Sequence, residues 1–124
     1  NWMFYGATSF NQPVGDWDVS NVTSMQALFR EAVKFNQPLN DWDVSNVVDL
    51  SGLFQAAAAT PTIFNQPIGN WNTSKVTNMN SMFANSVMFN QDIGNWNVSN
   101  VTDMSSIFYN AKSFNNRRTS KLCL

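Results

Sequence analysis

The stretch FNQDIGNWNVSNVTDMSSIF, residues 89–108, contains each element of a motif that recurs along the whole chain. Its opening phrase, Phe-Asn-Gln or Phe-Asn-Asn, begins at Phe10, Phe35, Phe64, Phe89 and Phe114, so the intervals are 25, 29, 25 and 25 residues. Self-similarity at such a period is typical of repeat proteins in which each unit buries its apolar face against its neighbours. The sequence therefore predicts a single stacked domain.

Each unit contains one segment typical of a strand and one typical of a short helix. The Trp-x-Val segments, of which residues 96–98 are one, predict short parallel strands. Apolar residues at i, i+3, i+4 and i+7, such as Met25, Leu28, Phe29 and Ala32, predict a helix of about two turns. We therefore expect an α/β fold, a leucine-rich-repeat-like solenoid of about four 25-residue coils, each a short parallel strand plus a short helix.

Repetition at a fixed phase predicts columns of like side chains through the stack. Phe, Trp and Val would form columns inside, and the asparagines of the Phe-Asn-Gln phrase would form a ladder along a turn. Thr23, Thr77 and Thr102 stand where helix N-cap hydroxyls are expected, whereas Val48 would weaken the second helix start. The extra residues of the 29-residue interval lie near 56–61 and predict a loop that protrudes on one face.

The repeat body is expected to span residues 1–116, with coil boundaries near 10, 35, 64 and 89. Residues 117–124 have no tryptophan and are expected to form a non-repeat tail. Asn1 aligns with the interior of a repeat and the chain has no initiator Met, so we expect a processed product or part of a longer protein.

The charge distribution argues against nucleic acid as a partner. The net charge is −1, but all eight acids and only four of the seven bases lie before residue 117. A body of negative charge repels phosphates, and Arg117, Arg118 and Lys121 form too small a basic patch to compensate. No apolar run approaches the roughly 18 residues of a membrane span, so we expect no span in this segment.

The chemistry of the chain argues against an enzyme. There is no histidine, and Cys123 is the only cysteine, so the commonest general base and the commonest zinc ligands are missing. We expect no catalytic residue and no cofactor. An active site would need a pair of aspartates in a cleft, which a short stack offers little room to form.

Four aspartates form a candidate cation site. Asp16, Asp18, Asp41 and Asp43 flank the tryptophans of the first two coils and could converge on a hard cation such as calcium. The third and fourth coils have asparagines at the same places, which indicates a position that requires polarity and not charge. A hydrated polar face is therefore the preferred interpretation, and no metal is expected.

Two kinds of carbohydrate site can be considered. The sequons at Asn21, Asn72, Asn97 and Asn100 are candidate glycosylation sites on a eukaryotic secretory route, although the repeat itself demands these residue types. The tryptophan column could stack on sugars if it faced outward. Its fixed phase beside the valines predicts that it packs inside.

The pattern Phe-Asn-Gln-x-Ile-x-x-Trp-x-Val-Ser-x-Val-Thr-x-Met-x-x-Met-Phe resembles the BspA-like leucine-rich-repeat surface proteins. Within that family it is similar to the subgroup first recognised as a domain of unknown function in mycoplasma surface lipoproteins. The resemblance covers roughly residues 1–116 and implies short strand-plus-helix coils. It also implies surface display, cell adhesion or protein interaction, but no active site, so no functional residue is carried over.

The leading hypothesis is a non-enzymatic protein–protein interaction or scaffold module, for example an accessory subunit of a larger assembly. It would dock through its strand face, the insertion or the exposed coil ends. The alternative is an extracellular surface adhesin or carbohydrate-binding module with a glycan ligand. The few charges, with polarity supplied by Asn, Ser and Thr, favour an extracytoplasmic location: secreted, on a surface or in an organelle lumen.

Overall fold

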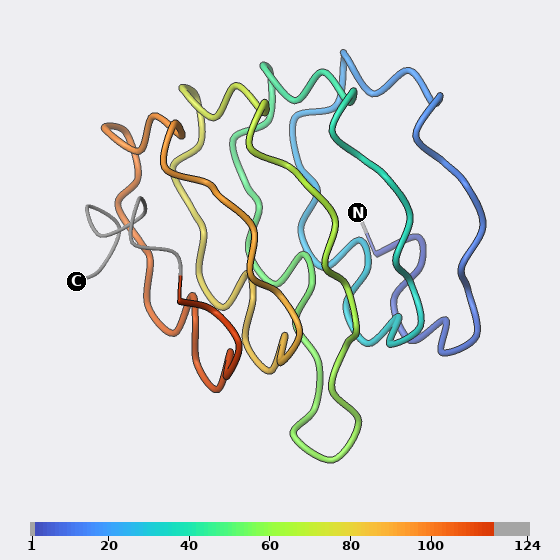
Figure 1. The fold of residues 1–124 in the computed structure, drawn as a ribbon. Coiled ribbons are helices and arrows are strands. Elements are labelled where there is room, and N and C mark those ends of the chain that lie inside the picture. The colour runs from blue at the N-terminus through green and yellow to red at the C-terminus, as the bar shows by residue number, and fades with distance from the viewer. Residues whose placement is uncertain (1, 116–124) are drawn as a thin grey trace.

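The computed structural model of the chain describes residues 2–115 and shows a stack of irregular coils, each lying against the next (Figure 1). Within these residues there is no helix and no extended strand, and hence no helix that could cross a membrane. Regular pairing is limited to isolated bridges: Ser24–Asp49, Asp49–Asn78 and Asn78–Asp103, all parallel, and Ala57–Thr60, antiparallel.

The predicted α/β solenoid of strand-plus-helix coils is therefore wrong, and the terms solenoid and leucine-rich repeat do not describe these coils. The expectations for the tail, residues 117–124 with Cys123, lie outside the described residues.

The segments predicted as helices form consecutive tight turns. We count the coils from the turn segments that begin at residues 2, 25, 50, 79 and 104. In the second coil the N–H groups of Leu28, Arg30 and Ala32 each donate to the carbonyl three residues earlier. The N–H groups of the intervening residues donate to carbonyls of the third coil, whereas an α-helix needs i→i−4 bonds within the segment. Ala27 and Glu31 have φ of 54° and 60°, in the left-handed region that interrupts a right-handed helix.

Left-handed positions recur in the other coils, usually in pairs four residues apart. They are Trp2, Gly6, Gly52, Ser81, Asn85, Ser106 and Asn110. Glycine adopts this conformation without strain, and asparagine tolerates it better than most residues. The i, i+3, i+4, i+7 pattern thus arises from turns with inward apolar side chains. We call the hydrogen-bonded segments 2–6, 25–31, 50–56, 79–85 and 104–110 the turn ladder.

The threonines expected as helix N-caps bond across the coils instead. The Val48 N–H donates to the Thr23 carbonyl at 2.8 Å, and the Thr77 N–H donates to the Val48 carbonyl at 2.8 Å. The Thr102 N–H and Oγ1 donate to the Thr77 carbonyl at 2.8 and 3.2 Å. Because no helix begins here, the N-cap prediction is wrong, and Val48 weakens no helix start.

Two columns of phenylalanines run through the core, and this prediction is confirmed. The first column is Phe4, Phe29, Phe54, Phe83 and Phe108, and the second is Phe10, Phe35, Phe64, Phe89 and Phe114. Rings that are neighbours along a column have centroids 5.5 to 6.3 Å apart. The two rings within one coil are 4.0 to 4.2 Å apart. Stacking therefore links every coil to the next.

A column of tryptophans also packs inside from the second coil onward. Trp42, Trp71 and Trp96 are buried, and their Nε1–H groups donate to the carbonyls of Val14, Leu39 and Ile68 in the preceding coil at 3.0, 2.9 and 3.0 Å. A buried indole N–H needs such a partner. Trp17 lies in the first described coil, with no earlier coil among residues 2–115, and is 47% exposed.

The asparagine ladder is present as predicted. It consists of Asn11, Asn36, Asn65, Asn90 and Asn115, and each N–H after the first donates to the Oδ1 of the preceding member at 2.9 or 3.0 Å. The glutamine after a ladder asparagine donates its Nε2–H to the same Oδ1, as Gln91 does to Asn65 at 2.9 Å. The ladder therefore uses the asparagine side chain as an acceptor.

Replacing Asn65 by aspartate and by leucine tests this role. Asn65→Asp keeps an oxygen for the Asn90 N–H and the Gln91 Nε2–H, so at pH 7 we expect the free energy of unfolding to change by less than about 0.5 kcal/mol. Asn65→Leu removes the acceptor and should cost about 1 to 2 kcal/mol. Urea denaturation measures both. Equal losses for the two variants would show that the amide NH₂ is the group that matters.

The insertion predicted near 56–61 protrudes from the stack, which confirms that prediction (Figure 1, green). Ala57 and Thr60 pair in an antiparallel bridge, and the Thr60 N–H donates to the Ala57 carbonyl at 3.1 Å. Residues 57–60 are exposed. The Phe columns continue from Phe54 to Phe83 and from Phe35 to Phe64, so the extra residues do not disturb the core.

Candidate functional site

The first coil leaves an apolar surface uncovered at one end of the stack. Trp2, Met3, Tyr5 and Trp17 are 47%, 68%, 42% and 47% exposed, and the half-buried Phe4 and Phe10 lie among them. We call Trp2, Met3, Phe4, Tyr5, Phe10 and Trp17 the N-terminal face. It is the largest group of exposed aromatic side chains that the described residues contain.

The N-terminal face is held in place by aromatic contacts. Phe4 stacks on Phe10 with centroids 4.1 Å apart, and its ring lies 5.8 Å from that of Trp17. Trp2 and Tyr5 have tilted rings 5.1 Å apart, and the Arg30 guanidinium lies 5.6 Å from the Tyr5 ring centroid. A cation over a tyrosine ring is attracted by its negative face. Trp2, Tyr5 and Trp17 are therefore each packed against a neighbouring ring.

For Trp17 and Phe4 the exposure follows from their place in the stack, whereas Trp2 lies beside Gln26, Ala27 and Arg30 of the next coil. Trp42, the counterpart of Trp17 in the second coil, is 4% exposed, and Phe29, the counterpart of Phe4, is 1% exposed. Each is covered by the coil before it. The sequence carried a signal for this surface, because Phe4 aligns with Phe29 and residues 2–10 therefore follow the repeat pattern.

The opposite end of the stack has a smaller uncovered surface. Tyr109 is 65% exposed, and Met104, Phe108 and Phe114 are half-buried. We call Met104, Ser106, Phe108, Tyr109, Asn110 and Phe114 the C-terminal face.

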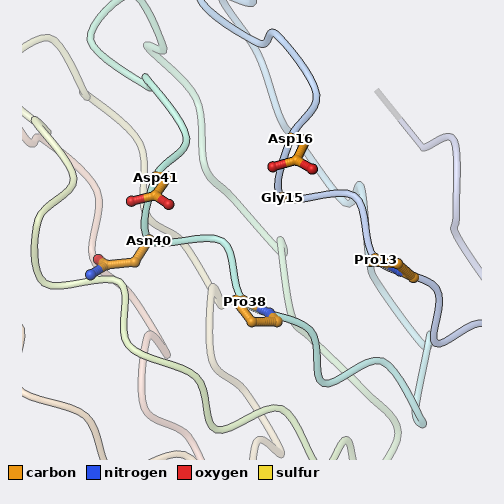
Figure 2. A pocket seen from close by; sticks show the side chains of 6 residues that line it. All are labelled: Pro13, Gly15, Asp16, Pro38, Asn40 and Asp41. Atoms are coloured by element: carbon orange, nitrogen blue, oxygen red, sulfur yellow. The ribbon is translucent and has the colours of Figure 1, made fainter.

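Two of the four aspartates predicted as a cation site line a groove between the first two coils. The groove has a volume of about 300 Å³ and is lined by Pro13, Gly15, Asp16, Pro38, Asn40 and Asp41. Figure 2 shows the Asp16 and Asp41 carboxylates at equivalent places on the two adjacent coils. The groove thus carries two carboxylates on an open surface.

The other two aspartates are engaged by their own turns. Asp18 Oδ1 accepts from the Ser20 N–H and Oγ at 3.0 and 2.6 Å, and Asp43 Oδ1 accepts from the same groups of Ser45 at 3.0 and 2.5 Å. The serine hydroxyls, followed by the backbone N–H groups, lower the pKa of both carboxyls below 3.8, although the Asp18 charge works in the opposite direction on Asp43.

The predicted cation set is therefore divided into two pairs with different surroundings. Among residues 2–115 there is no group of three or more His, Cys, Asp or Glu side chains that could hold a metal ion. The structure does not bring Asp16, Asp18, Asp41 and Asp43 together as ligands of one ion.

A turn of the same kind, at another place in the repeat, gives a pH-dependent expectation. The Ser105 Oγ and N–H donate to Asp103 Oδ1 at 2.6 and 2.9 Å, and the hydroxyl bond is the main cause of a pKa below 3.8. A pKa lowered by folding stabilises the native state above the unfolded pKa, and this stabilisation is lost as pH falls through the folded pKa. An NMR titration of Asp103 should give a midpoint below 3.8.

Two serine variants provide the control for that titration. Ser105→Ala should return the Asp103 midpoint towards 3.8, because it removes the hydroxyl donor. Ser105→Thr keeps a hydroxyl and should preserve the low midpoint. An unchanged midpoint in Ser105→Ala would contradict the assigned cause.

The candidate glycosylation sites all lie on exposed residues. These are Asn21, Asn72, Asn97 and Asn100. The side-chain oxygens of Asn72 and Asn97 accept from the N–H groups of Ser74 and Ser99 at 3.1 and 3.0 Å. The Asn100 Nδ2, the atom that would carry a glycan, donates to the Ser74 carbonyl at 2.6 Å. Three of the four amides therefore have structural roles in turns or between coils.

The tryptophans do not form an outward platform for sugars. Trp42, Trp71 and Trp96 are buried, so only Trp17 of that column is open to a ligand. The burial prediction is confirmed for those three residues, and the first coil is the exception.

One protein-family model, described as "Mycoplasma protein of unknown function, DUF285", matches the chain twice, over residues 1–62 and 59–121. The comparison with curated proteins and the comparison with solved structures found no match. The two matches together take in both halves of the repeat stack.

Proposed function

The chain belongs to the family described as "Mycoplasma protein of unknown function, DUF285", and we propose its function from the structure. We propose that it is a non-enzymatic protein–protein interaction or scaffold module that docks through the N-terminal face. One observation carries the proposal. Trp2, Met3, Tyr5 and Trp17 are all exposed, with Trp2 against Tyr5 and Trp17 against Phe4, whereas Trp42 and Phe29, the counterparts of Trp17 and Phe4, are buried.

The composition of the N-terminal face supports a protein partner. Tryptophan and tyrosine are over-represented among residues that dominate binding energy at protein interfaces, and methionine is also enriched there. Residues 2–10 contain no charged side chain, and the charged groups beside this face are Arg30, which lies over the Tyr5 ring, and Asp16 and Asp18, which flank Trp17. A contiguous apolar surface with these properties is typical of an interaction site.

The contacts that hold the face on the next coil also support a binding role. Phe4 stacks on Phe29 with centroids 5.5 Å apart, and the Phe4 N–H donates to the Leu28 carbonyl at 3.0 Å. A surface already held in one conformation loses little conformational entropy when a partner covers it. The face would therefore need no rearrangement of the backbone below it.

A second candidate function is an extracellular surface adhesin or carbohydrate-binding module. It is favoured by Trp17, an exposed indole flanked by Asp16 and Asp18, because sugars stack on aromatic rings and donate hydroxyls to carboxylates. The finer resemblance to BspA-like surface proteins supports the same alternative and the extracytoplasmic location. A glycan array with the wild type and Trp17→Ala would detect it.

The protein-binding function is tested by an affinity pull-down from native membrane and soluble fractions. Mass spectrometry of the intact bound material then identifies what was captured. Three baits are needed: the 124-residue chain, the double variant Tyr5→Ser with Trp17→Ser, and Met88→Ser. Met88 is 50% exposed and belongs to neither end face, so it matches the exposure of Trp17.

We expect the wild type and Met88→Ser to retain one stoichiometric protein that the double variant loses. Retention by all three baits would contradict docking through the N-terminal face. Recovery of glycans alone would favour the adhesin instead.

A further inference from the structure

Arg30 carries a buried donor without a partner on the side of the stack. Of the side-chain nitrogens and oxygens that residues 2–115 bury, its Nε is the one that makes no hydrogen bond. The Tyr5 ring has its centroid 5.6 Å from the guanidinium carbon and attracts the charge, but it is no substitute for a hydrogen-bond acceptor. An unsatisfied buried donor is rare in native proteins and calls for a specific explanation.

A cavity of about 130 Å³ adjoins this side chain. Its lining comes from four consecutive coils, so it lies along the turn ladder. Trp2 of the first coil borders it. We call it the Arg30 cavity, and its polar lining consists of Gln26, Arg30, Ser51, Gln55 and Asn80.

Small residues at one position of the repeat leave this space open. Ala27 and Gly52 line the cavity at left-handed positions with φ of 54° and 64°, and their counterpart in the first coil is Trp2. A Cβ on Gly52 would lie 3.1 Å from the Gln55 Oε1, so a larger side chain there would displace that amide. The cavity therefore follows from particular residues of the second and third coils and not from the regular repeat.

The lining has the chemistry of a site for an anion. Arg30 supplies a positive charge and a fork of N–H donors that matches a carboxylate or a phosphate. The Gln26 and Gln55 amides and the Ser51 hydroxyl add further donors, and no acidic side chain lines the cavity.

A carboxylate fits this site better than a phosphate. One guanidinium balances the single charge of a carboxylate, whereas a phosphate group carries nearly two charges at neutral pH. All eight acids and only four bases lie before residue 117, so the rest of the body would repel a second negative charge. The volume of the cavity accommodates the end of one acidic side chain.

From this chemistry we propose that the Arg30 cavity binds the carboxylate of an Asp or Glu side chain on the protein that docks at the N-terminal face. The proposal rests on the proposed function, because it names a chemical group of that partner. Two residues of the face connect it to the cavity: Trp2 borders the cavity, and the Tyr5 ring lies beside the Arg30 guanidinium. A partner that covers these rings is therefore placed to insert an acidic side chain.

The buried Nε favours this binding. In the free protein it has lost water without gaining an acceptor, which destabilises that arrangement of the side chain. A carboxylate in the cavity attracts the guanidinium, so the side chain turns towards it and the Nε–H gains an acceptor. Since the donor is desolvated before the partner arrives, binding adds the hydrogen bond without a new desolvation cost at this atom.

A titration of the full 124-residue chain with sodium acetate, followed by NMR of the side-chain N–H signals, probes the cavity with a carboxylate alone. Sodium chloride at equal ionic strength is the salt control, and sodium phosphate tests the other anion. Arg30→Gln removes the charge and introduces the residue type that the next coil has at this position, Gln55. Lys34→Gln is the matched control, because it removes the same charge from an exposed side chain that does not line the cavity.

We expect acetate to shift the Arg30 Nε–H and Gln55 NH₂ signals of the wild type along a saturating curve, and chloride to leave them in place. Lys34→Gln should give the same curve for Gln55. Arg30→Gln should abolish the Gln55 shift, while its backbone signals show that the fold is retained. Phosphate should bind more weakly than acetate.

Three results of the titration would overturn the proposal. An acetate response no different from that of chloride would exclude an anion site. A Gln55 shift that survives in Arg30→Gln would place the acetate elsewhere. Tighter binding of phosphate than of acetate would exclude the carboxylate as the preferred group.

The pull-down then decides whether the carboxylate comes from the protein partner. We expect Arg30→Gln to weaken capture of that protein by about 10- to 100-fold, as truncation of a hot-spot arginine does. Lys34→Gln should leave capture nearly unchanged. Equal capture by the two baits would contradict the proposal.

Failure of this proposal is distinguishable from failure of the proposed function. If Tyr5→Ser with Trp17→Ser loses the protein but Arg30→Gln retains it, docking through the N-terminal face stands and the carboxylate contact falls. If the only captured material is an acidic glycan that Arg30→Gln loses, the carboxylate belongs to a sugar, and both the protein partner and the proposed function fail.

Discussion

Phe54→Ala is expected to lower the free energy of unfolding by about 3 to 5 kcal/mol, the largest loss for any single substitution considered. Phe54 is 1% exposed and lies at the middle of its column, with the Phe29 and Phe83 rings both 5.9 Å away and the Phe64 ring 4.0 Å away. Truncation removes buried apolar surface and leaves a cavity that the neighbouring coils cannot fill. Urea denaturation followed by tryptophan fluorescence measures the loss.

Phe10→Ala is the matched control. Phe10 is half-buried and has one neighbour along its column among residues 2–115, Phe35 at 5.7 Å. We expect it to cost less than half as much as Phe54→Ala, since less surface returns to water. Equal losses would contradict the conclusion that stability comes chiefly from the middle of the columns.

Gly69→Ala is expected to cost up to about 3 kcal/mol, although Gly69 has no unusual φ. A Cβ at this position would lie 2.6 Å from the Asp92 carbonyl oxygen of the next coil. That oxygen belongs to the backbone, so relief requires the two coils to move apart. The free energy of unfolding in urea and the melting temperature should both fall.

Gly52→Ala separates this clash from ordinary glycine strain. Gly52 has φ of +64°, and its added Cβ would meet only the Gln55 Oε1 at 3.1 Å, the end of a flexible side chain. We expect a cost of about 1 kcal/mol from the left-handed conformation. A larger loss at Gly52 than at Gly69 would show that backbone conformation matters more than coil spacing.

The interior of the stack followed from the sequence, but the conformation of the turns did not. Phe29 and Phe54 are apolar at equal phases, so their burial in one column could be predicted. The same apolar spacing predicted helices, because inward side chains at i, i+3 and i+4 occur both in a helix and in the turn ladder. Gly52 and Asn85, which have positive φ, carried the signal that distinguishes the two.

The candidate surface was only partly accessible to sequence reasoning. Alignment of Phe4 with Phe29 indicated that residues 2–10 follow the repeat pattern, but not that Trp2 packs against Tyr5 or that Arg30 lies over the Tyr5 ring. The aspartates show the opposite case. Their spacing was visible in the sequence. Whether Asp18 binds a cation or accepts a hydrogen bond from the Ser20 hydroxyl depended on the local turn.

The sequence by itself determined the period, the order of the coils, the phenylalanine and asparagine columns and the place of the insertion. These features depend on the same residue type recurring at the same position of each repeat. Burial of apolar side chains is non-directional, so it depends little on the exact conformation of the backbone. Only the tertiary structure decided that alternate N–H groups donate between coils and not within helices. The physical reason is that a backbone donor is satisfied equally well by a local or a distant carbonyl, so the packing of neighbouring coils makes the choice.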